Sequence, residues 1–178
     1  MFEAFATLKQ HFAALRSDAE HWSLRYVRED HQHLAMRKLV AEPPRFSRDQ
    51  GAMLSVRVAG VEAYAATSDL SRQGLQAALE RATALARRIA PQALLDLHAL
   101  APSSERGEYR SPGLEDDFPS LAACYQLLAA ESAAVPRDPR LVNWRVGLDL
   151  TRSAQLYLNN SGAELRQAQR FVYPHLSV

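Results

Sequence analysis

The chain has 178 residues, which suits one domain or at most two small ones. Hydrophobic residues make up 47% and charged residues 23%, close to the globular average, so extensive disorder is not expected. The net charge of +1 gives no reason to expect nucleic acid or an anionic membrane as the main partner. The sequence has no apolar run long enough to span a bilayer, and its N-terminus does not resemble a signal peptide. We therefore expect a cytoplasmic protein.

The first third of the chain predicts a helix followed by antiparallel strands. Along the N-terminal helix, apolar residues recur at spacings of three and four: Phe2, Phe5, Leu8, Phe12 and Leu15. From residue 22 to residue 67 the period changes to two, which is typical of half-buried strands. The predicted strands cover residues 22–27, 32–39, 53–58 and 61–66, with turns at Glu29-Asp30 and Gly60. Such short connections favour antiparallel pairing.

The clearest helix begins after Asp69 or Ser71, either of which can cap it, and ends at Pro91. Its apolar stripe consists of Leu75, Ala78, Leu79, Ala82, Leu85, Ala86 and Ile89. We expect residues 99–118 to form a long loop between two halves of the chain.

A third helix is predicted over residues 119–134, with Leu121, Tyr125 and Leu128 facing inward. Strands then return at residues 142–149 and 155–158, and a turn at 159–162 leads into a last strand, 163–172. This order predicts a single α+β domain over residues 1–178, in which two longer helices and an N-terminal helix pack on an antiparallel sheet.

Several short motifs occur in a fixed order along the chain. They are Gly51, the Val-Arg-Val unit centred on Arg57, the turn at Gly60, the Thr-Ser-Asp-Leu-Ser run that contains Asp69 and Ser71, the alanine-rich helix after it, the first strand near residues 19–26, and the hairpin Asn160-Ser161-Gly162. Together they resemble the N-terminal domain of the TldD/PmbA family. These bacterial and archaeal proteins were once called modulators of DNA gyrase and are now regarded as zinc metallopeptidases. A glycine of the family pattern is replaced at Met53 or Leu54, and the subtype, TldD-like or PmbA-like, stays open.

The resemblance implies a supporting role in a proteolytic chamber that admits unfolded peptides. The family's metal site is a His-Glu-x-x-x-His helix completed by a distant cysteine, and no histidine of this chain lies in such a motif. We therefore expect an N-terminal domain without its zinc-bearing C-terminal domain, and with no catalytic residue, metal ligand or cofactor of its own. The expected partners are a peptide or unfolded protein and a homologous subunit in a homo- or heterodimer.

Three other groups of residues have simple structural explanations. His31 and His33 lie on one face of a strand, as in some metal sites, but no third ligand is near in sequence, so we expect exposed strand residues. Glu115-Asp116-Asp117 are expected to cap the third helix rather than to act as paired acid and base. Cys124, the single cysteine, lies in an apolar helix and is expected in the core rather than as a nucleophile.

The remaining polar candidates indicate no chemistry. Arg57 points away from the core and either pairs with a carboxylate or lines a cleft. Ser161 fits a turn and lacks the context of a nucleophile elbow. The early strands carry basic residues without an aromatic platform for nucleic acid: Arg28, Arg37, Lys38, Arg45 and Arg48.

Three hypotheses of function follow from the sequence. The first is a non-catalytic N-terminal domain of a TldD/PmbA-type peptidase. The second is a standalone interaction module that binds a TldD/PmbA-type partner. The third is an unrelated small α+β enzyme, which ranks lowest because no catalytic constellation is present.

Overall fold

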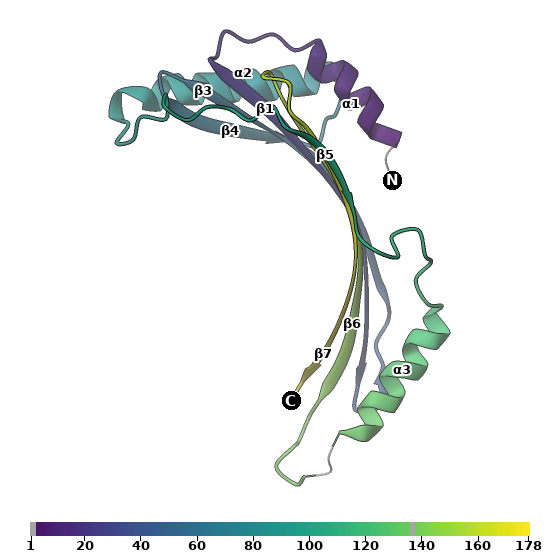
Figure 1. Ribbon diagram of the computed structural model, residues 1–178. Coiled ribbons are helices and arrows are strands. Elements are labelled where there is room, and N and C mark those ends of the chain that lie inside the picture. Colours follow the sequence, from purple (N-terminus) through teal and green to yellow (C-terminus); the bar gives the residue numbers. More distant parts are fainter. Residues whose placement is uncertain (1–2, 136–137) are drawn as a thin grey trace. The chain divides into compact units, whose positions relative to one another are not determined.

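The computed structural model describes residues 3–135 and 138–178, and it confirms the predicted α+β class (Figure 1). Its elements are α1 (Glu3–Ala13), β1 (His21–Arg37), β2 (Val40–Ala41), β3 (Arg45–Val58), β4 (Val61–Thr67), α2 (Arg72–Ile89), the 3-10 turn η1 (Ala90–Gln92), β5 (Arg106–Arg110), α3 (Leu121–Ala134), β6 (Arg145–Asn159) and β7 (Glu164–Ser177). The strands form one sheet in the order β4-β3-β1-β6-β7-β5, and the short β2 pairs with β1. None of the described helices is long and apolar enough to cross a lipid bilayer.

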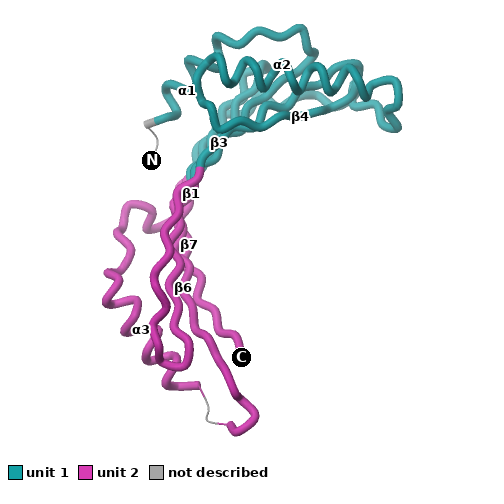
Figure 2. Tube along the Cα trace, turned by 180° about the vertical axis from the view of Figure 1, so that it is seen from behind, with its two compact units in different colours: residues 1–28, 50–109, 154–167 teal, residues 29–49, 110–153, 168–178 magenta. Residues whose placement is uncertain are grey.

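The chain forms two compact units, which Figure 2 colours separately. Unit 1 comprises residues 1–28, 50–109 and 154–167, and unit 2 comprises residues 29–49, 110–153 and 168–178. Strands β1, β3, β6 and β7 each contribute residues to both units.

Unit 1 has the larger core, which α1 and α2 build together with the sheet. Helix α2 buries the predicted stripe, and Leu75, Leu79 and Ala82 are almost fully buried against sheet residues such as Leu54 and Leu156. Its N-terminus is fixed as predicted, because the Ser71 hydroxyl accepts a hydrogen bond of 3.1 Å from the backbone N–H of Gly74.

Unit 2 has a smaller core between α3 and one face of the sheet. Its buried members are Leu34, Met36, Cys124, Leu128, Val146, Leu148 and Leu150. Successive side chains of a strand point to opposite faces. Because Leu34 and Leu148 face α3, their neighbours His33 and Asp149 lie on the opposite face of the sheet.

The predicted turn at Glu29-Asp30 is wrong, since β1 runs through it to Arg37. Asp30 forms an ion pair with Arg48 of β3, which stabilises an acidic residue inside the sheet. The chain turns instead at Lys38 and Leu39, which have φ of 45° and 67°. The buried Ser132 of α3 supports this turn, because its hydroxyl accepts a hydrogen bond of 3.3 Å from the backbone N–H of Leu39.

Other strands are longer than predicted. β3 begins at Arg45, and β6 is one strand where two were expected. β5 lies inside the predicted loop 99–118, and β7 extends to Ser177. The predicted hairpin before β7 is confirmed, with Gly162 at a φ of 95° that disfavours other residues.

The predicted face of α3 needs one correction, because Leu121 is 41% exposed while Leu128 is buried. Phe2 of the predicted N-terminal helix lies outside the described residues.

Candidate functional site

Ionisable side chains gather in unit 2 on the sheet face opposite α3. We call this group the histidine–carboxylate cluster; it consists of His31 and His33 of β1, Glu42, Arg145 and Asp149 of β6, and His175 of β7.

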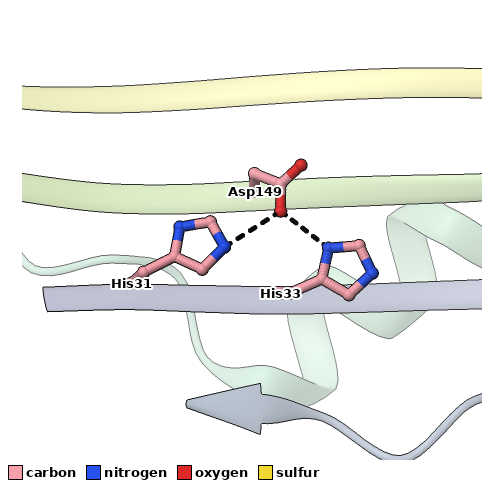
Figure 3. Close-up of side chains that lie close together, drawn as sticks. All are labelled: His31, His33 and Asp149. Atoms are coloured by element: carbon pink, nitrogen blue, oxygen red, sulfur yellow. Dashed lines mark hydrogen bonds and ion pairs between the residues drawn. The ribbon is translucent and has the colours of Figure 1, made fainter. Parts of the chain in front are cut away.

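Asp149 is the centre of the cluster. Its Oδ1 atom lies 2.6 Å from Nδ1 of His33 and 3.3 Å from Nε2 of His31. Figure 3 shows both imidazoles, on one strand, directed at the same carboxylate oxygen on the adjacent strand. The side chains of His31, His33 and Asp149 are 38%, 20% and 23% exposed, so the histidines are not the freely exposed residues that the sequence predicted.

Contacts with Thr151 and Arg145 orient the rings of His31 and His33. Nδ1 of His31 lies 2.8 Å from the Thr151 hydroxyl, which leaves Nε2 directed at Asp149. Nη2 of Arg145 lies 2.8 Å from Nε2 of His33. Because a guanidinium can only donate, Nε2 of His33 accepts this bond, and the proton of the neutral ring lies on Nδ1, facing Asp149.

Arg145 is held in turn by Glu42. Its Nε donates to Oε1 of Glu42 at 3.0 Å, and its Nη2 donates to Oε2 at 2.8 Å. These hydrogen bonds from Arg145 are the main reason that the pKa of Glu42 falls from 4.5 to about 2. The guanidinium of Arg145 therefore stays paired with the ionised carboxylate of Glu42 beside His33 above about pH 4.5.

His175 completes the cluster from β7. Its Nδ1 lies 3.4 Å from Oδ2 of Asp149, and its ring stacks on that of His33 with centroids 5.9 Å apart. The ring occupies the space over Gly147, where an added Cβ would lie 2.2 Å from Nε2 of His175. Glycine at position 147 therefore makes room for this histidine.

The cluster has the donor atoms of a metal site and no nucleophile. Within the described ranges, His31, His33 and Asp149 are the one set of three potential ligands whose donor atoms all lie within 4.8 Å of one another. Sequence reasoning found the two histidines but missed Asp149, which is 116 residues from His33. The available signal was the alternation of Asp149 with Leu148 and Leu150, which places it on the polar face of a strand.

The residues that carry the family resemblance do not join this cluster. Gly51, Arg57, Gly60, Asp69, Ser71, Asn160, Ser161 and Gly162 all belong to unit 1. Arg57 donates to the backbone carbonyl of Leu100 at 2.6 Å, and Asn160 accepts a bond of 3.1 Å from the backbone N–H of Trp22. Ser161 lies in the turn, where its backbone N–H donates to Asn159 Oδ1 at 3.0 Å.

Asp69 and Gly60 also hold backbone in place. Oδ1 of Asp69 accepts a bond of 3.0 Å from the backbone N–H of Ser71. Gly60 turns the chain between β3 and β4 with a φ of 70°, and its carbonyl accepts a bond of 2.8 Å from the N–H of Leu97. The motif residues described here therefore hold backbone segments and turns in place.

The acidic run before α3 differs from expectation. Ser120, not Asp116 or Asp117, caps α3, because its hydroxyl accepts a bond of 3.2 Å from the N–H of Ala123. The backbone carbonyls of Asp116 and Asp117 instead accept hydrogen bonds from Arg152 and Arg170. These two guanidinium groups also lie over the ring of Phe118, at 4.9 Å and 4.5 Å from its centroid.

Cys124 lies on the buried face of α3, as predicted, and burial raises the pKa of its thiol. A buried thiol with a raised pKa is a poor nucleophile, which agrees with a core role.

Comparison with known proteins supports the family resemblance. Residues 22–86 match the model of the PmbA/TldA metallopeptidase domain 1. No curated protein matches the chain at a significant level.

Solved structures share the fold over nearly the whole chain. A Bacteroides thetaiotaomicron protein described as a modulator of DNA gyrase matches 99% of this chain and 41% of its own, at 14% identity and a TM-score of 0.66. A Thermotoga maritima protein with the same description matches 96% of this chain and 38% of its own, at 14% identity and a TM-score of 0.64. TldE of Thermococcus kodakarensis matches 97% of this chain and 38% of its own, at 13% identity and a TM-score of 0.65. This chain therefore spans about two fifths of the length of the solved structures that it matches.

Proposed function

We propose, from the confirmed resemblance to the N-terminal domain of the TldD/PmbA family, that this chain is the non-catalytic scaffold domain of a metallopeptidase of that type. Its role is to help enclose the chamber that receives unfolded peptides. The observation that carries the proposal is the agreement of the domain 1 match over residues 22–86 with the shared fold over 96–99% of the chain.

The proposal assigns peptide hydrolysis to another domain. The family's zinc motif needs two histidines one helical turn apart and an adjacent glutamate. None of the six histidines of this sequence is followed by glutamate, and His31 and His33 lie on a strand. The residues of this chain therefore do not fit the family's catalytic zinc, and no hydrolytic step is assigned to them.

The end of β7 is a suitable surface for an extended peptide. β5 ends at Arg110, and its pairing with β7 ends near Ala168, whose carbonyl accepts a bond of 2.9 Å from the N–H of Ser111. The following part of β7 exposes Phe171, Val172, Tyr173 and Leu176, which are 49–65% exposed. An edge strand with exposed apolar side chains can pair with an incoming strand.

The test has two arms. The chain, with and without added Zn²⁺, should not cleave an unfolded, fluorescently labelled polypeptide, whereas chelator-sensitive cleavage would refute the assignment. The same polypeptide should bind the chain by fluorescence anisotropy. Tyr173→Ser should weaken this binding, and Tyr64→Ser is the matched control because both tyrosines are 65% exposed.

The alternative proposal is a standalone cytoplasmic interaction module that binds a TldD/PmbA-type subunit. The same exposed apolar residues of β7 would then contact that subunit. Size-exclusion chromatography with light scattering, with and without a purified TldD/PmbA-type protein, tests this. Formation of a stable complex that excludes the labelled polypeptide would favour the module over the scaffold domain.

A further inference from the structure

We propose that His31, His33 and Asp149 form a binding site for one divalent transition-metal ion of the Zn²⁺ class. The proposal goes beyond the scaffold role and does not depend on it. It also departs from the expectation that the chain holds no metal, because Asp149 supplies the third ligand that was not near the histidines in sequence.

The donor set and its spacing suit such an ion. Zn²⁺ binds imidazole nitrogen and carboxylate oxygen at about 2.0–2.2 Å, so neighbouring donor atoms on one ion lie about 3.4 Å apart. Nε2 of His31 and Oδ1 of Asp149 are already 3.3 Å apart. Nδ1 of His33 lies 2.6 Å from the same oxygen and has to move away by less than about 1 Å, which a small ring rotation supplies. Two imidazoles and one carboxylate favour Zn²⁺, Ni²⁺ or Cu²⁺ over Mg²⁺ and Ca²⁺.

The site is partly organised before an ion arrives. Metal-bound histidines usually hold their second nitrogen in a hydrogen bond that fixes the ring. Thr151 provides this contact for Nδ1 of His31, at 2.8 Å. Both histidines and Asp149 lie on adjacent strands, which restrict the backbone more than loops do. Their side chains remain 20–38% exposed, so an ion can reach them from solvent.

Binding of the ion would move a proton within the ring of His33. In the metal-free site, Nδ1 of His33 carries the proton that faces Asp149, because Arg145 donates to the other ring nitrogen. On binding, Nδ1 loses that proton and donates its lone pair to the ion. The proton is taken up at Nε2 of the same ring, from which Arg145 turns away. Arg145 can do so because its hydrogen bonds to Glu42 remain.

His175 gives a second indication that the cluster is incomplete. Its Nδ1 is buried and has no hydrogen-bond partner within residues 3–135 and 138–178. It lies 3.4 Å from Oδ2 of Asp149. When Oδ1 binds the ion, this nitrogen is placed to donate to the second oxygen and hold the carboxylate in position.

Calorimetric titration of the metal-stripped 178-residue chain with Zn²⁺ tests the proposal. We expect saturable binding of one ion. Because the proton displaced from Nδ1 of His33 is taken up at Nε2 of the same ring, buffers of different ionisation enthalpy should show no net proton release from this histidine. Co²⁺ should give visible absorption bands of a nitrogen- and oxygen-ligated ion, and Mg²⁺ should not bind. The absence of saturable Zn²⁺ binding together with an unperturbed Co²⁺ spectrum overturns the proposal.

Variants locate the site. His31→Gln and Asp149→Asn should each weaken Zn²⁺ binding at least 10-fold. Thr151→Val should weaken it by about 10-fold, which is the lower end of the range for residues that hydrogen-bond to a metal ligand. His98→Gln is the matched control, since it removes an exposed histidine of unit 1 that also contacts carboxylates. Circular dichroism checks that each variant is folded. Binding that His31→Gln and Asp149→Asn leave unchanged while both stay folded places the ion elsewhere and overturns the assignment.

Discussion

The two units of the molecule use their residues differently. Unit 1 buries a large apolar core under α1 and α2, and the residues that carry the family resemblance belong to it. Unit 2 covers one sheet face with α3, while the opposite face holds three histidines, two carboxylates and an arginine in mutual contact. The motif residues that carry the resemblance therefore belong to unit 1, and the residues of the candidate site belong to unit 2.

The low identity to the solved structures explains why the match to known proteins says little about the cluster. The fold is shared with structures that are only 13–14% identical, so shape is preserved with few identical residues. Packing tolerates exchange among apolar residues of similar volume. A metal site or an ion pair does not tolerate such exchange, so the two units should respond differently to substitution.

The largest expected difference concerns the two cores. Leu79→Ala on α2 should lower the free energy of unfolding by about 3 kcal/mol, because a fully buried leucine in a dense core leaves a cavity. Leu128→Ala on α3 should cost about 2 kcal/mol, because the smaller core of unit 2 can collapse more easily. Urea denaturation measures both values.

Hydrogen exchange then shows where each loss acts. Leu79→Ala should speed exchange in α2, and Leu128→Ala should speed exchange in α3. Leu127→Ala, which removes a leucine that is 49% exposed on α3, is the control with little expected effect. An equal loss of protection in both helices for either variant would show that the units do not have separate stabilities.

The sequence predicted an element correctly where the residues that determine its bounds lie within it or next to it. Helix α2 combines an apolar stripe, the Ser71 cap and Pro91, so its bounds could be predicted. The length of β1 could not be predicted, because Asp30 is stabilised by Arg48 on another strand. Asp149 was missed for the same reason, since its importance depends on histidines far away in the chain. Local patterns thus predicted elements, while cross-strand polar contacts were visible only in the structure.

Ser132→Ala tests a polar support inside the core of unit 2. The buried hydroxyl accepts hydrogen bonds from Trp144 Nε1 at 2.9 Å and from the backbone N–H of Leu39 at 3.3 Å. Its removal leaves two donors without their acceptor and should cost about 2 kcal/mol in urea denaturation. Ser132→Cys has a similar shape but a weaker acceptor, so its free energy of unfolding should lie between those of the unsubstituted protein and Ser132→Ala. A loss below about 0.5 kcal/mol for Ser132→Ala would mean that water replaces the hydroxyl.

Ser71→Ala tests the corresponding polar support in unit 1, at the start of α2. Loss of the cap to the N–H of Gly74 should lower stability by about 1 kcal/mol. Ser71→Asp restores a side-chain acceptor at the cap and should recover most of that loss. If Ser71→Ala costs as much as Ser132→Ala, the two units do not differ in how strongly they depend on a single polar contact.

The smallest expected effect is the pH-dependent contribution of Glu42 in unit 2. Its pKa is about 2 in the folded protein against an ordinary value of 4.5, chiefly because of hydrogen bonds from Arg145. A lowered folded pKa means that Glu42 stabilises the folded state above about pH 4.5, and this contribution disappears as the pH falls toward 2. Glu42→Gln should therefore lower the urea midpoint at pH 7, and the difference from the unsubstituted protein should shrink between pH 4.5 and pH 2. Glu131→Gln, an exposed glutamate on α3, controls for the loss of one negative charge. A difference for Glu42→Gln that stays constant across this pH range would show that the Arg145 pair does not hold the charge of Glu42 in solution.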